Sequence, residues 1–288
     1  MYFDPKTNKF PYTEFTDQHY LKVKKNNGLV FDENYPYIDN SKKFKFKKWW
    51  FDIPYYLIAI PFALLRLGLK VKGRKNLKKY KDVIDKGVIS ICNHVHMFDY
   101  LAITHAIRFR KPKVLVWASN VRGESGSAVR MVGGIPIPED DFRATAKYLK
   151  DVKEYLDKGG WLHIYPEGSM WEYYAPIRPF KKGAAHLAIK YDKPIIPMAI
   201  SYRKPGWIRK KVFKQIATLT LSIGEPIFVN KDLPKEEQEK DLNKRCHDAV
   251  CLLAGIDPND NIYDAEFKNS KRIDYYTDTY GVGYKGSW

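Results

Sequence analysis

Between residues 69 and 255, short apolar runs alternate with segments of helical periodicity, and this alternation restricts the fold more than any other feature. Strands are expected at residues 69–73, 88–92, 114–118, 161–165, 195–201, 217–223 and 226–229. Helices are expected at 97–109, 141–158, 181–191 and 235–254, whereas the polar segment 75–85 is expected to be helical or irregular. The glycine-rich segment 121–138 is expected to form turns. Strands alternating with helices predict an α/β fold with a mixed, largely parallel sheet flanked by helices.

The pattern divides the chain into four regions. Residues 1–41 are polar and aromatic and contain three prolines, so we expect an irregular N-terminal arm. Residues 42–69 are basic and then apolar, and residues 70–255 carry the strand–helix alternation. Residues 256–288 are polar and rich in tyrosine, and we expect them to form a C-terminal tail on the surface.

The segment 42–69 has the composition of a membrane-associating helix. Basic and aromatic residues at its start are suited to lipid headgroups, namely Lys45, Lys47, Lys48, Trp49 and Trp50. Only 13 residues separate Asp52 from Arg66, and as a helix they would cover roughly 20 Å of a hydrocarbon core that is ~30 Å thick. Pro54 and Pro61 weaken a straight span further. We expect the segment to lie within one leaflet; a buried core helix with a basic lead-in is the alternative.

The composition favours an anionic partner inside a reducing compartment. Lys and Arg outnumber Asp and Glu by 50 to 33, which gives a formal charge of +17 and suits nucleic acid, an anionic membrane surface or a phosphorylated substrate. Three cysteines form no metal-binding spacing and cannot all pair, which favours a reducing compartment. The first residues lack the pattern of a secretory signal, and no nucleic-acid motif is visible.

The stretch GVISICNHVHMFDY, residues 87–100, places a histidine at the end of an expected strand. Asp99 follows His94 by five positions. In one continuous helix these side chains would point about 140° apart, so they meet only if His94 lies in a turn and Asp99 in the first turn of the next helix. A histidine held by a carboxylate is a general base with its orienting partner.

Further motifs follow in order: GGIPIPE at 133–139, YPEGSMW at 165–171, FKKG at 180–183 and PIIPMAI at 194–200. Together with NHVHMFD at 93–99, they resemble the motifs of the glycerolipid acyltransferase family, which includes the lysophosphatidic acid acyltransferases. The family patterns are NHxSxxD, GxIPxxR, FPEG(S/T)R and FKxG. The resemblance covers roughly residues 55–230, and it implies a glycerol-3-phosphate acyltransferase-like fold for the domain at 70–255.

The resemblance implies a reaction and a set of residues. A fatty acyl group passes from acyl-CoA or acyl carrier protein to the free hydroxyl of a lysophospholipid, most readily lysophosphatidic acid, at the cytoplasmic face of the cell membrane. His94 is then the base and Asp99 its orienting partner, and neither a metal nor a cofactor beyond the acyl donor is expected. Substrate binding is implied for Asn93, Glu167, Gly168, Ser169, Arg178, Lys181 and Lys182. Of these, Glu167 either contacts a glycerol hydroxyl or anchors its loop.

The chain departs from the family pattern at two positions. Glu139 and Met170 stand where the family usually has arginines that are credited with phosphate binding. Arg130, Arg143, Arg178 or the two lysines would have to replace them, or the acceptor carries no phosphate there. The head group of the acceptor therefore stays open.

Two other function classes compete with acyl transfer. His94, His96 and Asp99, with His163 and His186 elsewhere, resemble the clustered ligands of a metal-dependent hydrolase, although the spacing differs from H-x-H-x-D-H. A non-catalytic lipid-binding relative would explain the basic and aromatic residues and the two missing arginines.

Overall fold

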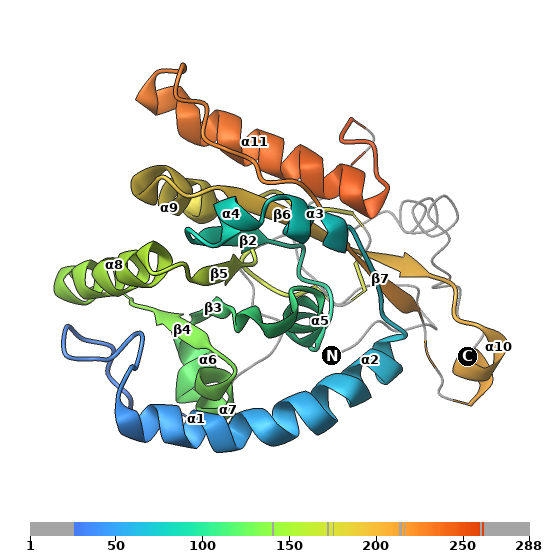
Figure 1. Cartoon of the computed structure of the whole chain (residues 1–288), viewed down its shortest axis with the longest axis horizontal. Coiled ribbons are helices and arrows are strands. Elements are labelled where there is room, and N and C mark those ends of the chain that lie inside the picture. The colour runs from blue at the N-terminus through green and yellow to red at the C-terminus, as the bar shows by residue number, and fades with distance from the viewer. Residues whose placement is uncertain are drawn as a thin grey trace.

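The computed structural model describes residues 26–139, 141–171, 173–174, 176–212, 215, 217–259 and 261. Within these ranges seven strands form one sheet in the order β1-β7-β6-β2-β5-β3-β4 (Figure 1). Neighbouring strands are parallel except for the antiparallel pair β6 and β7. The predicted mixed, largely parallel sheet is confirmed. The strands are β1 Lys70–Lys72, β2 Val88–Ile91, β3 Lys113–Trp117, β4 Gly134–Ile137, β5 Trp161–Ile164, β6 Ile195–Arg203 and β7 Thr218–Ile223.

Helices cover both faces of the sheet, and each face has its own apolar core. On one face β2, β5 and β6 pack against α8 Phe142–Asp157, α9 Gly183–Tyr191 and α11 Lys235–Ala254. On the other, β2, β6 and β7 pack against α5 Asp99–Ala106 and the end of α2 Ile60–Leu67. Shorter helices connect these elements: α3 Arg74–Lys79, α4 Lys81–Ile84, the 3₁₀ turn Arg108–Arg110, α6 Ala118–Arg122, α7 Gly126–Met131 and α10 Trp207–Lys211.

The structure corrects three sequence expectations. Residues 121–138 do not form a run of turns, because this segment contains the end of α6, the helix α7 and the edge strand β4. The glycines are needed for close packing: a Cβ on Gly126 would lie 1.9 Å from the carbonyl oxygen of Val121. Residues 226–229 form only an isolated bridge, between Ile227 and Ile195, instead of a strand. The helix α10 was not expected at all.

Residues 26–41, the described part of the predicted arm, contain no helix or strand, but their aromatic side chains enter the core. Tyr37 is buried and contacts Tyr148 of α8 edge to face, with ring centroids 5.7 Å apart. The first 25 residues of the predicted arm and most of the predicted C-terminal tail lie outside the described residues.

The basic and apolar segment forms one continuous helical rod along the lower edge of the molecule (Figure 1). It consists of α1 Lys42–Pro54, the π-helix η1 Tyr55–Ala59 and α2 Ile60–Leu67. Pro54 does not end the rod although it cannot donate a backbone hydrogen bond to the preceding turn, and the π-helix η1 lies between Pro54 and Pro61. By length and composition, this 26-residue helix is the one candidate for a membrane span in the described part of the chain.

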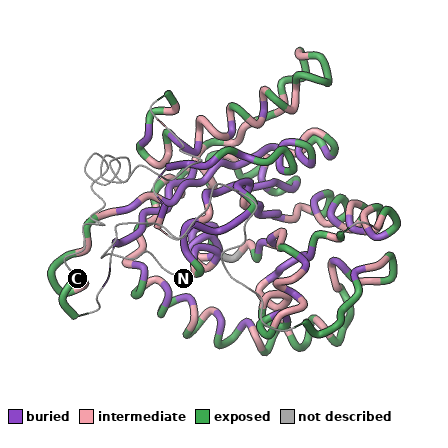
Figure 2. Tube along the Cα trace, turned by 180° about the vertical axis from the view of Figure 1, so that it is seen from behind, coloured by how far each residue is buried: buried purple, intermediate pink, exposed green. Residues whose placement is uncertain are grey.

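One side of the rod is docked on the domain and the other is exposed. Asp52, which is buried, receives Lys48 Nζ at 2.8 Å and Lys111 Nζ at 2.9 Å. Lys48 Nζ also donates to the carbonyl oxygen of Met131 at 2.8 Å, so its ammonium group faces the domain. Exposed residues recur along the rod (Figure 2). The exposed apolar side chains are those of Phe46, Trp49, Trp50, Ile53, Leu57, Ile58, Phe62 and Leu65.

Candidate active site

Two loops leave the sheet side by side and form the site. β2 and β5 are adjacent and parallel, so the segments that follow Ile91 and Ile164 emerge at the same edge, where open α/β sheets bind ligands. The loops are joined through their backbones: Trp171 N donates to the carbonyl oxygen of His94 at 3.0 Å, and Tyr173 N donates to that of Val95 at 2.9 Å.

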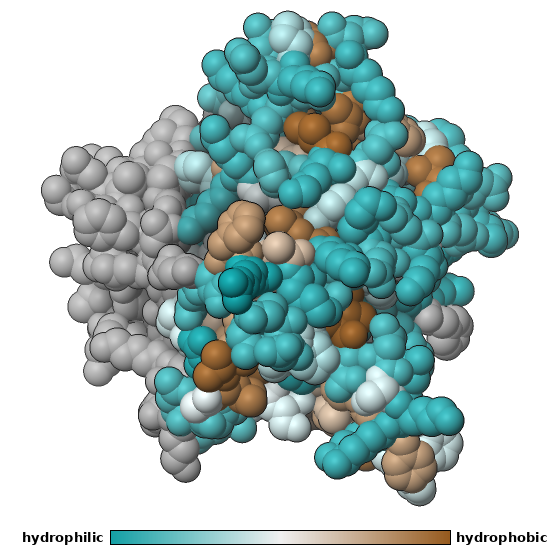
Figure 3. Space-filling model, turned by 90° about the vertical axis from the view of Figure 1, so that its left-hand side faces the viewer, coloured by the Kyte–Doolittle hydropathy of each residue, from teal (hydrophilic) through white to brown (hydrophobic). Residues whose placement is uncertain are grey.

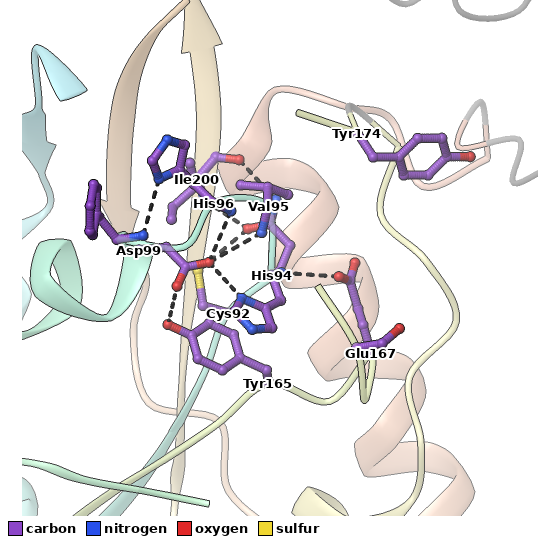
Figure 4. Close-up of polar contacts among 12 residues, drawn as sticks. Cys92, His94, Val95, His96, Asp99, Tyr165, Glu167, Tyr174 and Ile200 are labelled. Carbon is purple, nitrogen blue, oxygen red and sulfur yellow. Dashed lines mark hydrogen bonds and ion pairs between the residues drawn. The ribbon is translucent and has the colours of Figure 1, made fainter. Parts of the chain in front are cut away.

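His94 and Asp99 are in direct contact (Figure 4), as the strand–turn–helix arrangement requires. His94 Nδ1 lies 2.7 Å from Asp99 Oδ2, and Asp99 is the first residue of α5. Val95 N also donates to Asp99 Oδ2 at 3.1 Å. The Asp99 side chain is 1% exposed and that of His94 25%. Because the ionised carboxylate only accepts, Nδ1 carries the proton of a neutral ring and Nε2 is left as the accepting nitrogen.

Tyr165 supports both members of this pair. Its hydroxyl donates to Asp99 Oδ1 at 2.7 Å, and its ring stacks on the His94 ring at a centroid distance of 4.0 Å and 15° between planes (Figure 4). Burial would raise the pKa of Asp99, but the charge of His94 and the hydrogen bonds from His94 and Tyr165 outweigh it, and the net shift is downward. Sequence reasoning did not assign Tyr165 a role, although it stands where the family motif has phenylalanine.

A buried ion pair organises the second loop. Glu167 Oε2 accepts from Arg178 Nη2 at 2.8 Å and from His94 N at 3.0 Å, and both charged side chains are 1% exposed. Glu167 Oε1 accepts from Arg178 N at 3.0 Å. Glu167 thus anchors its loop to the His94 turn, which is one of its two expected roles. The guanidinium of Arg178 is enclosed by Glu167, Ser169 and the Trp171 ring instead of facing a ligand.

The other small polar residues predicted to bind substrate are mostly internal. Asn93 is fully buried and exchanges two hydrogen bonds with the backbone of Ile200 in β6. Ser169 Oγ accepts from Arg178 Nη1 at 2.9 Å. Gly168 has φ of +82°, a conformation that favours glycine, and it forms the turn in which its N–H donates to the Tyr165 carbonyl. These residues shape the turns on which His94 is carried.

The two lysines differ in direction. The helix α9 begins at Gly183, one residue after Lys182. The side chain of Lys181 extends over Gly168, since a Cβ built there would lie 2.7 Å from Lys181 Cε. Lys182 Nζ instead lies 3.6 Å from Glu239 of α11. Of the pair, Lys181 is therefore the cation beside the loop that follows β5.

The arginines considered as replacements for the family's phosphate ligands lie elsewhere. Arg130 donates to the backbone carbonyls of Pro36, Tyr37 and Gly134 and so holds the N-terminal arm. Arg143 is exposed at the start of α8. The positions where the family has arginine are also accounted for: Glu139 pairs with Arg122, and Met170 is buried.

Arg66, at the end of α2, is a cation that sequence reasoning did not propose as a ligand. Burial is the main cause that lowers the pKa of His96 to about 4, and the charges of Asp99 and Arg66 act on that pKa in opposite directions. Arg66 is thus close enough for its charge to act on His96, two residues after His94. In the sequence, Arg66 could have been noticed as the basic residue at the end of the apolar segment.

The histidines do not assemble with carboxylates as metal ligands would. Among the residues that the structure describes, no three His, Cys, Asp or Glu side chains form a group able to hold a metal ion. His96 Nδ1 accepts a hydrogen bond from Phe98 N at 3.1 Å. His163 is buried in β5, where its Nδ1 lies 2.8 Å from Ser90 Oγ.

Comparison with known proteins agrees with this geometry. Residues 68–201 match the model of the Acyltransferase family. The resemblance inferred from the motifs is thus confirmed, and the matched residues contain both loops of the site.

Similar proteins include enzymes named 1-acyl-sn-glycerol-3-phosphate acyltransferase. That of Helicobacter pylori is 31% identical over 43% of this chain and 53% of its own length. That of Cocos nucifera is 23% identical over 62% of this chain and 61% of its own length, and the human alpha enzyme is 26% identical over 43% and 44%. The chain therefore spans about half the length of these relatives. A crystal structure of the LPA acyltransferase of Thermotoga maritima shares 17% identity, covers 73% of this chain and 95% of its own, and has a TM-score of 0.46.

Proposed function

We propose that the protein transfers a fatty acyl group from a thioester to the free hydroxyl of a lysophospholipid. The observation that carries this proposal is the 2.7 Å contact between the partly exposed ring of His94 and the buried carboxylate of Asp99. The pair lies within the segment that matches the acyltransferase family. Lysophosphatidic acid is the proposed acceptor, and the names of the similar enzymes support it.

The geometry suits direct transfer without an acyl-enzyme. His94 Nε2 takes the proton of the acceptor hydroxyl while its oxygen attacks the thioester carbonyl. A C–O bond forms and the C–S bond breaks, and the sulfur leaves as a thiol after it receives the proton from His94. Asp99 holds the ring by Nδ1 and stabilises the imidazolium that forms between these two proton transfers, as in hydrolase triads.

The positive charges at the margin of the site suit an anionic acceptor. Arg66 lies at the end of the membrane-facing rod, and Lys181 lies beside Gly168. A phosphate group bound between the rod and the second loop would leave its acyl chain near the exposed apolar side of α2. This arrangement replaces the two arginines that the family usually has with cations from other elements.

We also propose that the protein works on a membrane surface of a reducing compartment, which for a cell is the cytoplasmic face. The exposed apolar side of the rod and the lysines at its start support association with an anionic bilayer. The docking of Asp52 on the domain supports a helix that lies along the surface, because one side of it contacts protein. All three cysteines are free and buried, which suits a reducing compartment.

An acyl-transfer assay tests the proposed reaction. The detergent-purified protein is given radiolabelled acyl-CoA or acyl carrier protein and a panel of lysolipids with and without a phosphomonoester. We expect transfer to lysophosphatidic acid, with kcat lowered at least about 10³-fold in His94→Ala. His186→Ala, a change on the exposed surface of α9, is the matched control and should retain activity. Transfer to none of the lysolipids, or equal activity of His94→Ala, would contradict the proposal.

A further inference from the structure

The connection between β6 and β7 carries an exposed apolar and basic helix that the site does not use. It is α10, Trp207–Lys211, and none of its residues is buried. Trp207 is 72% exposed, Ile208 61% and Val212 63%. Arg209, Lys210 and Lys211 lie among these side chains, and Lys204 precedes them. Single exposed apolar residues are ordinary, but three of them beside four cations on one short connection indicate a binding surface.

Hydrogen bonds fix α10 to the end of the rod. Arg209 Nη1 donates to the carbonyl oxygen of Leu65 at 2.5 Å, and Gln215 Nε2 donates to that of Arg66. Arg209 Nη1 also donates to Gln215 Oε1 at 3.1 Å, which joins the two donors. Both carbonyl groups lie in the last turn of α2, and that of Leu65 also accepts from Gly68 N at 3.3 Å. The position of α10 relative to α2 is therefore set by the fold.

Apolar side chains are exposed both on α10 and at the end of α2, the two elements that these hydrogen bonds join. Phe62 and Leu65 are the exposed apolar side chains at the end of α2, and Leu65 supplies the carbonyl that Arg209 holds. Figure 1 shows α10 at the right-hand edge of the molecule, beyond the end of α2. On the side face in Figure 3 the surface is mostly hydrophilic, and its apolar residues lie in small separate patches.

We propose that α10 is a second membrane contact, which inserts Trp207, Ile208 and Val212 into the headgroup region of an anionic bilayer. A lipid surface is the occupant because tryptophan, aliphatic residues and several cations on one short element match the interface between headgroups and acyl chains. The inference rests on the membrane association proposed above. Contact at both α10 and the rod fixes the tilt of the domain and holds the end of α2, with Arg66, at the bilayer surface.

Binding to lipid vesicles tests α10 with matched variants. The full chain is sedimented with vesicles of phosphatidylcholine alone or with 30% phosphatidylglycerol. We expect Ile208→Glu to weaken binding to the anionic vesicles by about tenfold, because it replaces an inserted apolar group with a charge of the same sign as the lipid. The control is Leu252→Glu on α11, whose leucine is 65% exposed and thus comparable; it should bind as the unchanged protein does.

A second variant separates the charge from the apolar contact. Lys211→Gln should weaken binding to the anionic vesicles by about fivefold and leave binding to phosphatidylcholine unchanged. Far-UV circular dichroism and the thermal midpoint establish that the variants fold. They should match the unchanged protein, since Ile208 and Lys211 are exposed.

The outcomes distinguish this inference from the proposed function. If Leu57→Glu on the rod abolishes vesicle binding while Ile208→Glu binds normally, α10 is not a membrane contact and the membrane association stands. A protein that binds no anionic vesicles in its unchanged form would overturn both. The inference would also be overturned if Leu252→Glu weakened vesicle binding as much as Ile208→Glu does. The loss of binding would then come from the added negative charge alone.

Discussion

At the scale of single residues, the geometry of the site depends on the hydrogen bonds that the carboxylate of Asp99 accepts. Asp99 receives His94 Nδ1 and Val95 N on one oxygen and the Tyr165 hydroxyl on the other. A carboxylate held on both oxygens keeps one orientation, and it keeps the histidine in one tautomer. The HxxxxD spacing made the first contact predictable. The contact from the Tyr165 hydroxyl was not predictable, because Tyr165 lies in the loop after a different strand, β5.

Tyr165→Phe tests this positioning role. The variant keeps a ring to stack on His94 but removes the donor to Asp99 Oδ1. Removing that donor takes away a hydrogen bond that lowers the pKa of Asp99, and it frees the carboxylate to turn, so that Asp99 holds the His94 ring less firmly. We expect kcat to fall about three- to tenfold with little change in KM. A change in KM with kcat unchanged would show that the hydroxyl acts only through the structure of the loop.

The surroundings of Arg178 also differ from those that its residue type suggests. An arginine beside a candidate phosphate site suggests a phosphate ligand, because its fork of donors fits an oxyanion. In the structure that fork is used by Glu167 and Ser169, and the side chain is 1% exposed. A buried carboxylate requires a partner, and this requirement decides the place of the arginine. Burial therefore determines which groups the Arg178 guanidinium contacts, and a single sequence does not show which residues are buried.

At the scale of elements, the helical rod shows how one sequence segment serves two surfaces. Lys47 and Lys48 are adjacent and look equivalent in the sequence. Lys47 is exposed, whereas Lys48 pairs with Asp52 and caps the Met131 carbonyl. A helix turns about 100° per residue, so neighbouring lysines face different surroundings. Contact with lipid headgroups was predicted for both lysines, and of the two only Lys47 is in an exposed position that allows it.

Two matched substitutions separate these roles. Lys47→Gln should weaken binding to anionic vesicles by about fivefold and leave the thermal midpoint unchanged. Lys48→Gln should lower the free energy of unfolding by about 1 kcal/mol, because Asp52 loses one of two cations that hold it in a buried position. Thermal unfolding and vesicle sedimentation of both variants check this. Equal effects of the two changes on both measurements would contradict the assignment.

At the scale of the whole molecule, the core beneath the site contains histidines that are neutral when the protein is folded. Burial lowers the pKa of His163 to about 3, and burial is also the main cause that lowers the pKa of His96 to about 4. Both values lie below the 6.5 of an unfolded chain. The unfolded state therefore binds more protons than the folded state below about pH 6.5, and stability falls as the pH falls. Asp99, whose pKa is lowered, acts in the same direction.

This linkage predicts a marked acid sensitivity. Between pH 7 and pH 5 the free energy of unfolding should fall by roughly 2 kcal/mol for each of the two histidines. Urea denaturation at several pH values measures the slope, and His163→Gln should reduce it by about half. NMR titration of the ring protons provides a second measurement, in which His163 should stay neutral down to at least pH 4. Protonation of His163 near pH 6 would contradict the prediction.

The sequence by itself determined the architecture and the central pair. The strand–helix alternation predicted the mixed sheet, and the HxxxxD spacing at a strand end predicted that His94 and Asp99 meet, because both patterns are local. The tertiary structure alone decided which charges face inward, that Tyr165 completes the support of Asp99, and that α10 adjoins the end of α2. These features join residues that are distant in the chain. Their energies depend on burial and on partners from other strands and helices, and the order of residues in one sequence does not specify these.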